Sequence, residues 1–130
     1  MTSSSISLTL LVDDYEKAIN YYCEVLQLFA VAVNTRLSSQ DKYLLLSFKG
    51  EINFTLNLIR ANTKEATQFI GKQGGGYPLL VLPVPECKTV ALDLLAKNIE
   101  VGEIEKLPWG NQLIVNDPFG NKICLFETYP

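Results

Sequence analysis

Residues 108–127 read PWGNQLIVNDPFGNKICLFE, with apolar runs on either side of a short polar segment. The runs Gln112–Val115 and Lys122–Phe126 are typical of β-strands. Between them, residues 117–120 read Asp-Pro-Phe-Gly, with Asp, Pro and Gly at the first, second and fourth positions that a type I turn prefers. We therefore predict two strands that are joined by a type I turn.

Upstream of this segment, the hydrophobic pattern changes from strand to helix and back. Tyr77–Val84 is predicted to be a strand, and Pro85 starts a helix with an apolar face. The helix is predicted to end near Asn98, because asparagine tolerates the left-handed conformation of a helix cap. A further strand is predicted from Ile99–Val101 together with Ile104 and Leu107. The predicted order is therefore βαβββ.

The first half of the chain repeats this order. Ile6–Val12 is an apolar, β-branched run typical of a buried strand. An amphipathic helix over residues 14–26, with Asp13 as its N-terminal cap, is predicted to follow. Three more strands are predicted at Phe29–Leu37, Tyr43–Phe48 and Ile52–Ile59. We therefore expect an α+β fold made of two βαβββ modules, each with a mixed sheet.

The two modules are predicted to form a single domain, since 130 residues is the length of one domain. Module one covers about residues 5–60, and module two covers about residues 77–128. A linker over about residues 61–76 joins them, with a short helix near 63–71 followed by the triglycine segment Gly74–Gly76.

The composition of the chain excludes several classes of protein. There is no histidine, which excludes Ser/His/Asp and Cys/His nucleophile pairs and imidazole metal ligands. A net charge of −3 has the wrong sign for nucleic-acid binding. Three cysteines without CxxC spacing are typical of a reducing compartment. No signal peptide or membrane span is visible, so we expect a cytoplasmic protein without nucleic-acid or membrane partners.

The duplicated order, with LLVDDYEKAINYYCEVLQLF at residues 10–29 and the segment 108–127, resembles the vicinal oxygen chelate superfamily. This superfamily includes glyoxalase I, extradiol dioxygenases, fosfomycin-inactivating enzymes and bleomycin-resistance proteins. The resemblance implies that each module curls its four strands into a U-shaped sheet that encloses a cavity. It also implies that the modules pair, and that the chain forms a homodimer as small members commonly do.

Metal-using members of this superfamily hold a divalent ion with histidine and glutamate from the first and last strands of each module. The resemblance puts these positions at Ser7, Leu79 and Cys124, and at either Phe54 or Thr55. None of these residues carries an imidazole or a carboxylate. One thiolate with one hydroxyl falls short of the three or four ligands of a stable zinc site. We therefore expect neither a metal nor any other cofactor.

Without a metal, the resemblance to the bleomycin-resistance proteins implies a cavity that sequesters a small organic molecule such as an antibiotic. Because the resemblance places Ser7 at a ligand position that faces the cavity, strand alternation puts Thr9 and further polar and aromatic side chains on that same side. The candidate ligand-binding residues are Ser7, Thr9, Asn57, Trp109, Gln112, Cys124 and Phe126. Trp109 has two interpretations, a stacking platform at the mouth of a strand or a core residue at the module joint.

Two other functions remain open at this point. One is a metal-independent lyase, isomerase, hydrolase or dioxygenase-like enzyme that uses Cys124, Glu127 or a tyrosine hydroxyl as acid or base. The other is a regulatory or interaction subunit that binds another protein through a sheet edge or a dimer face. The leading hypothesis, a metal-free ligand-binding protein, assigns no catalytic residue.

Overall fold

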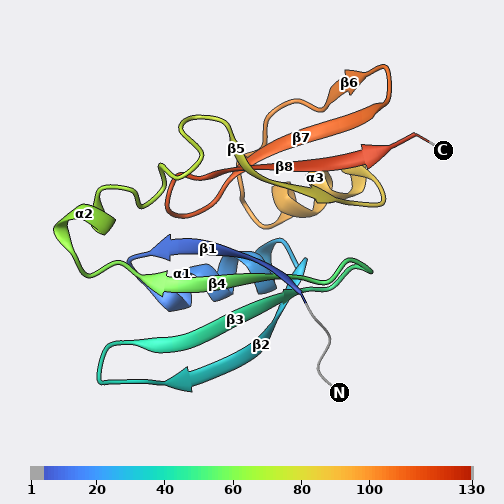
Figure 1. The fold of residues 1–130 in the computed structure, drawn as a ribbon. Coiled ribbons are helices and arrows are strands. Elements are labelled where there is room, and N and C mark those ends of the chain that lie inside the picture. The colour runs from blue at the N-terminus through green and yellow to red at the C-terminus, as the bar shows by residue number, and fades with distance from the viewer. Residues whose placement is uncertain (1–4, 130) are drawn as a thin grey trace. The chain divides into compact units, whose positions relative to one another are not determined.

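The structure is a computed structural model, and it describes residues 5–129. The chain divides into two compact units, Met1–Gly71 (unit 1) and Lys72–Pro130 (unit 2). Each unit contains one four-stranded mixed sheet with helices, which Figure 1 shows in blue to green and in yellow to red. Across residues 5–129, no helix has the length and apolar character needed to cross a membrane.

Unit 1 has the order strand, helix and three strands. Its elements are β1 (Ile6–Val12), α1 (Tyr15–Ile19), η1 (Asn20–Val25), β2 (Phe29–Arg36), β3 (Lys42–Phe48), β4 (Phe54–Arg60) and the short α2 (Lys64–Thr67). The order in the sheet is β1-β4-β3-β2, with β1 parallel to β4 and the other pairs antiparallel. The predicted strands of this half are confirmed to within two residues at their ends.

Unit 2 repeats this topology. Its elements are β5 (Pro78–Pro83), α3 (Cys87–Ala96), β6 (Glu105–Leu107), β7 (Gly110–Asn116) and β8 (Lys122–Thr128). The sheet has the order β5-β8-β7-β6, and β5 is parallel to β8 as β1 is to β4. The α+β class and the two βαβββ modules are therefore confirmed, and both sheets are open rather than closed into barrels.

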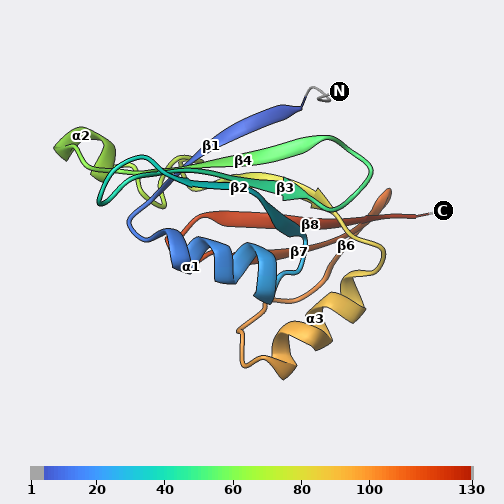
Figure 2. The same ribbon diagram turned by 90° about the horizontal axis from the view of Figure 1, so that it is seen from below.

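One face of each sheet forms a core with the helix of its own unit. In unit 2, α3 packs on β7 and β8 (Figure 2). In unit 1, Tyr22 of η1 packs edge-to-face on Phe29 of β2, with ring centroids 5.7 Å apart. The buried strand residues of this face alternate along the strands, as one-sided burial requires. They are Leu10, Val12, Leu44, Leu46, Leu56, Leu58, Leu80, Leu82, Leu113, Val115, Ile123 and Leu125.

The opposite face of each sheet, which we call the open face, carries the intervening residues of the same strands. In unit 1 these are Ser7, Thr9, Leu11, Leu45, Ser47, Thr55, Asn57 and Ile59. In unit 2 they are Val81, Pro83, Gln112, Ile114, Asn116, Cys124 and Phe126.

The first helix differs from the prediction in its cap and in its geometry. Asp14, not Asp13, is the N-cap, because its backbone is extended and its carboxylate accepts the backbone N–H groups of Glu16 and Lys17 at 2.9 and 3.4 Å. The second half of the helix, η1, is a π-helix. Its wider turn buries Tyr21 together with Tyr22, whereas the predicted 3.6-residue period places only Tyr22 in the core.

The predicted strand at Ile99–Val101 is wrong. These residues form a loop after α3, and only Glu105–Leu107 pair with β7. The reason lies in the helix end: Asn98 adopts the left-handed conformation at φ 61°, as predicted, and the Ile99 N–H donates to the Leu94 carbonyl at 2.9 Å. The backbone N–H of Ile99 therefore closes the end of the helix and cannot pair with a strand.

Candidate functional site

Three candidate residues lie together on the open face of unit 1. Ser7 and Thr9 of β1 are paired in register with Thr55 and Asn57 of β4. The Ser7 and Thr55 hydroxyls hydrogen-bond each other. Phe54 lies opposite Ile6 and therefore points to the other side of the sheet. The pairing thus selects Thr55, not Phe54, as the residue that faces Ser7 at the superfamily's metal position.

Asn57 has an unusual environment on this face. Its Oδ1 atom is buried and receives no hydrogen bond from any residue that the structure describes. Leu45 of β3 lies opposite it on one side, and Thr9 on the other. A buried acceptor without a donor costs about 1–3 kcal/mol, and such groups in native proteins are often satisfied by a ligand or an ordered water.

A second group of candidate residues lies on the open face of unit 2. The Cys124 thiol lies 3.6 Å from Oε1 of Gln112, and the Gln112 amide donates to the Glu105 carboxylate at 3.1 Å. Phe126 is the register partner of Gln112 on the adjacent strand. The three predicted residues Gln112, Cys124 and Phe126 therefore lie together. Hydrogen bonds link the Cys124 thiol to the Gln112 amide and this amide to the Glu105 carboxylate.

The environment of Cys124 keeps its sulfur protonated. Burial raises the pKa of the Cys124 thiol above its ordinary value of 9.0, and the negative charge of Glu105 raises it further. Because the thiolate is the form that attacks electrophiles and binds metals, Cys124 is a weak nucleophile and a weak ligand near neutral pH.

The residues at the superfamily's metal positions do not fit a divalent ion. Ser7 and Thr55 offer only hydroxyls, and Cys124 offers a protonated thiol. Leu79 lies at a bulge in β5, so that Val81 rather than Leu79 faces Cys124. No group of three or more Cys, Asp or Glu side chains within residues 5–129 could hold a metal. The donors in place suit hydrogen bonds to a neutral molecule.

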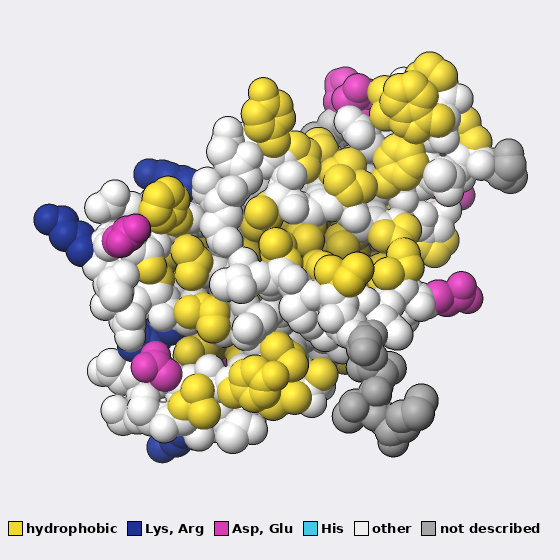
Figure 3. All heavy atoms as spheres, viewed as in Figure 1, with side chains coloured by type: hydrophobic (Ala, Val, Ile, Leu, Met, Phe, Trp, Pro, Cys, Tyr) yellow, Lys and Arg dark blue, Asp and Glu magenta, His cyan; other side chains and the backbone are white. Residues whose placement is uncertain are grey.

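Trp109 lies in the turn between β6 and β7, and its side chain is 62% exposed. Trp109 is therefore not part of the core of unit 2. Figure 3 shows apolar side chains exposed over unit 2, where Tyr77, Val81 and Tyr129 are also exposed. An exposed indole is available for stacking.

Glu127 does not lie with Cys124 on the open face. Its Oε1 atom accepts the Cys87 N–H at 2.8 Å and the Asn111 amide at 3.4 Å. The carboxylate is thereby held at the first residue of α3, where it complements the helix dipole. Its alternation with Cys124 along β8 also directs it to the helix side. Glu127, one of the alternative acid–base residues of the enzyme hypothesis, is therefore engaged in helix capping on the side of the sheet opposite to Cys124.

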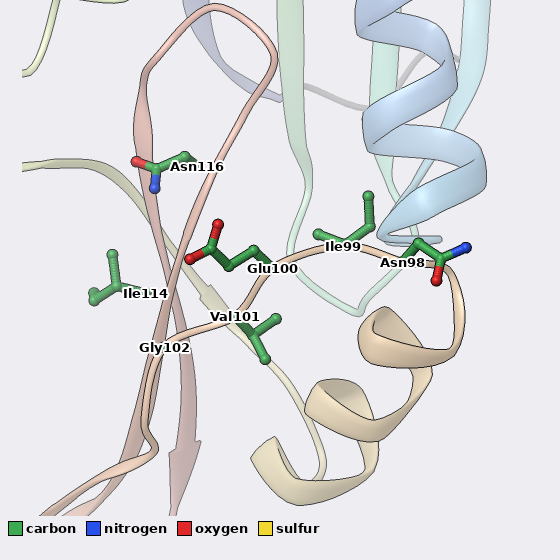
Figure 4. Close-up of a pocket in the computed structure, with 7 residues that line it drawn as sticks. All are labelled: Asn98, Ile99, Glu100, Val101, Gly102, Ile114 and Asn116. Carbon is green, nitrogen blue, oxygen red and sulfur yellow. The ribbon is translucent and has the colours of Figure 1, made fainter.

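Sequence reasoning missed a pocket of about 490 Å³ in unit 2 (Figure 4). Its walls are the loop after α3 and the end of β7, with the lining residues Asn98, Ile99, Glu100, Val101, Gly102, Ile114 and Asn116. Ile114 is the register partner of Cys124, so the pocket adjoins the candidate residues of the open face. The left-handed Asn98 was the available signal, since a chain reversal there argues against a strand directly after it.

Comparisons with known proteins match the sequence to one superfamily and the fold to several solved structures. The family model of the Glyoxalase/Bleomycin resistance protein/Dioxygenase superfamily matches residues 6–125. The antibiotic binding protein TnmS3 from Streptomyces sp. CB03234 is 23% identical, with a TM-score of 0.76 and 98% of each chain covered. The fosfomycin resistance protein FosX from Listeria monocytogenes is 12% identical, with a TM-score of 0.69 over 99% of this chain and 96% of that one.

A protein of Shewanella frigidimarina (strain NCIMB 400), described as uncharacterized, is similar in sequence. It is 36% identical over 83 residues, which are 63% of this chain and 61% of that protein. The matched region thus spans less than two thirds of this relative.

Proposed function

Since the chain belongs to the Glyoxalase/Bleomycin resistance protein/Dioxygenase superfamily, we propose that it binds and sequesters a small organic molecule without a metal. The proposed contacts in unit 1 are Ser7, Thr9 and Asn57. The proposed contacts in unit 2 are Trp109, Gln112, Cys124 and Phe126. A ligand on the open face of either unit is held by hydrogen bonds and apolar contacts and is released unchanged.

One observation carries this proposal: the metal positions of the superfamily hold neutral side chains, and the polar ones among them hydrogen-bond other neutral side chains. Ser7 is bonded to Thr55, and Cys124 is bonded to Gln112. Such groups exchange one hydrogen-bond partner for another when a ligand arrives, whereas a divalent ion requires anionic or imidazole donors. The chemistry of these donors supports binding rather than metal-assisted catalysis.

The same faces indicate which molecules are suitable. Hydroxyl and amide groups lie beside Leu45, Ile114 and Phe126, so polar anchors alternate with apolar surface. This mixture is typical of sites for drug-sized organic molecules. The fold shared with TnmS3, an antibiotic binding protein, supports an antibiotic as the ligand.

The proposal includes a homodimer and a cytoplasmic location. Exposed aromatic residues such as Tyr77 and Trp109 support an association between copies, because large apolar surfaces on soluble proteins mark interaction sites. The three cysteines are free, which suits a reducing compartment. Light scattering at several concentrations tests the dimer directly.

A thermal-denaturation screen tests the proposed function. Untagged protein is heated with divalent metals and, separately, with a panel of aromatic and cationic antibiotics. A ligand at 100 times its Kd adds about 2.7 kcal/mol, which raises the Tm of a domain this size by on the order of 10 °C. A rise with an organic compound and none with metals supports the proposal. A rise with a metal alone contradicts it.

A further inference from the structure

We propose that the pocket between the loop after α3 and the end of β7 binds a protonated organic amine, with Glu100 as its counter-ion. This inference rests on the proposed ligand-binding function, and it names the chemical class of one part of the ligand. The amine lies against the Glu100 carboxylate, and the carbon skeleton next to it lies against the apolar walls.

The size and walls of the pocket suit such a group. Its volume of about 490 Å³ falls within the roughly 300–1,000 Å³ of typical small-molecule sites. Ile99, Val101 and Ile114 are half-buried and supply apolar wall. Gly102 has no atom within 4 Å of the position that a Cβ would take, so the loop leaves open space there.

The charge that lines the pocket is negative. Glu100 is the one charged residue among those that line it, and neither lysine nor arginine is present. Three other carboxylates of unit 2 have partners: Glu105 binds Gln112, Glu127 binds Cys87, and Asp117 binds Asn121. Among residues 5–129, Glu100 has no ion pair and no side-chain hydrogen bond. Its carboxylate is therefore available to a cation.

The position of Glu100 is set by the structure around it. The loop begins at Asn98, whose N–H donates to the Leu95 carbonyl at 3.0 Å, and Ile99 is bonded to Leu94. In Figure 4 the Glu100 side chain extends from this loop toward β7, where Asn116 lies. The Asn116 amide oxygen can accept a second N–H of an ammonium group, because an ammonium carries three donors. Anchoring of the loop lowers the entropic cost of binding.

The test uses two compounds of the same shape, 2-phenylethylamine and its neutral counterpart 2-phenylethanol. Each is titrated into ¹⁵N-labelled protein, and the amide resonances are followed by NMR. We expect the amine to shift the resonances of Glu100, Val101, Ile114 and Asn116. We expect the alcohol to bind about threefold to tenfold more weakly, because a charge-assisted hydrogen bond is stronger than a neutral one.

Two variants identify the carboxylate. Glu100→Gln keeps the shape of the side chain and removes its charge, so amine binding is expected to fall to the level of the alcohol. Glu103→Gln is the matched control, because Glu103 follows in the same loop and does not line the pocket. If both variants weaken amine binding equally, the protein's overall charge explains the effect and the inference is wrong.

Failure of the inference is distinguishable from failure of the proposed function. If antibiotics of the panel bind but the amine shifts no resonance of the pocket, the amine site is refuted and the binding function stands. The same holds if alcohol and amine bind equally well and Glu100→Gln changes nothing. If neither the panel nor the amine binds, both proposals are refuted.

Discussion

Replacement of Asn57 by leucine should stabilise the protein and lower its affinity for the ligand. Asn57→Leu removes the buried Oδ1 that has no donor among the described residues, and leucine fills nearly the same space. An unsatisfied buried acceptor costs about 1–3 kcal/mol. Because the Asn57 side chain as a whole is only half-buried, we expect the lower end, a gain of about 1 kcal/mol in the free energy of unfolding.

The stability of this variant is measured by urea denaturation, with circular dichroism as the signal. Asn34→Leu in β2 is the matched control, because it makes the same chemical change at an exposed strand position. Its effect should stay within about 0.5 kcal/mol, as for most surface substitutions. A gain at both positions would indicate a general preference of strands for leucine and not the removal of an unpaired oxygen.

The ligand measurement uses any compound that raises the Tm of the wild-type protein. If a ligand donor satisfies Oδ1, Asn57→Leu should weaken binding by about tenfold, or about 1.4 kcal/mol. Asn57→Asp keeps an acceptor at that position and should bind more tightly than the leucine variant. Loss of more than about 1 kcal/mol of stability in Asn57→Leu, with ligand affinity unchanged, would refute the reasoning.

Three further predictions concern unit 2. Glu127→Ala should lower the free energy of unfolding by about 1–2 kcal/mol in urea, because the carboxylate caps α3 through the Cys87 N–H. Trp109→Ala should weaken ligand binding in the thermal screen and change stability by less than about 0.5 kcal/mol, because the indole is exposed. Burial raises the pKa of the Cys87 and Cys124 thiols above 9.0, so they stay protonated in the folded protein after unfolded thiols ionise. Stability is therefore present in full below pH 9.0 and should fall as the pH rises above it, measured as urea midpoints.

Each of these predictions has a control. Glu103→Ala removes a carboxylate from an exposed loop position and should leave stability unchanged, so an equal loss there would contradict the capping role of Glu127. Tyr77→Ala removes another exposed aromatic side chain, 77% accessible, that is not a proposed ligand contact. Equal loss of ligand binding in both aromatic variants would show that Trp109 is not a specific ligand contact. Cys124→Ala should reduce the fall in stability at high pH. If the pH dependence of stability is unchanged in this variant, groups other than Cys124 cause the fall.

The features of the fold that depend only on residues close together in the sequence were predictable. The turn at Asp117 forms as expected, with the Gly120 N–H donating to the Asp117 carbonyl at 3.1 Å. Asn98 takes its left-handed conformation, and the two strand–helix repeats fall where the hydrophobic periods change. Turn chemistry and side-chain alternation act over a few residues, so they can be deduced without knowledge of the rest of the chain.

The predictions were wrong where the local sequence was compatible with two structures. Asp13 and Asp14 are both good caps, and in the structure Asp14 caps the helix directly before the buried Tyr15. Ile99–Val101 is as apolar as a strand, yet the helix end uses Ile99. The hydrogen bonds that settle these cases involve backbone groups, which the side-chain pattern does not reveal.

Alternation along each strand divided the residues between two faces, because side chains on a strand point to opposite sides in turn. The superfamily's metal position at Ser7 then selected the face that carries Asn57, Gln112 and Cys124. Which residues face each other across strands was decided by the tertiary structure alone. The β1–β4 register pairs Ser7 with Thr55 across an interval of 48 residues, and a shift of one residue would have placed Phe54 there. The Glu100 pocket likewise needs a loop and a strand that meet only when unit 2 has folded, so no local pattern contains it.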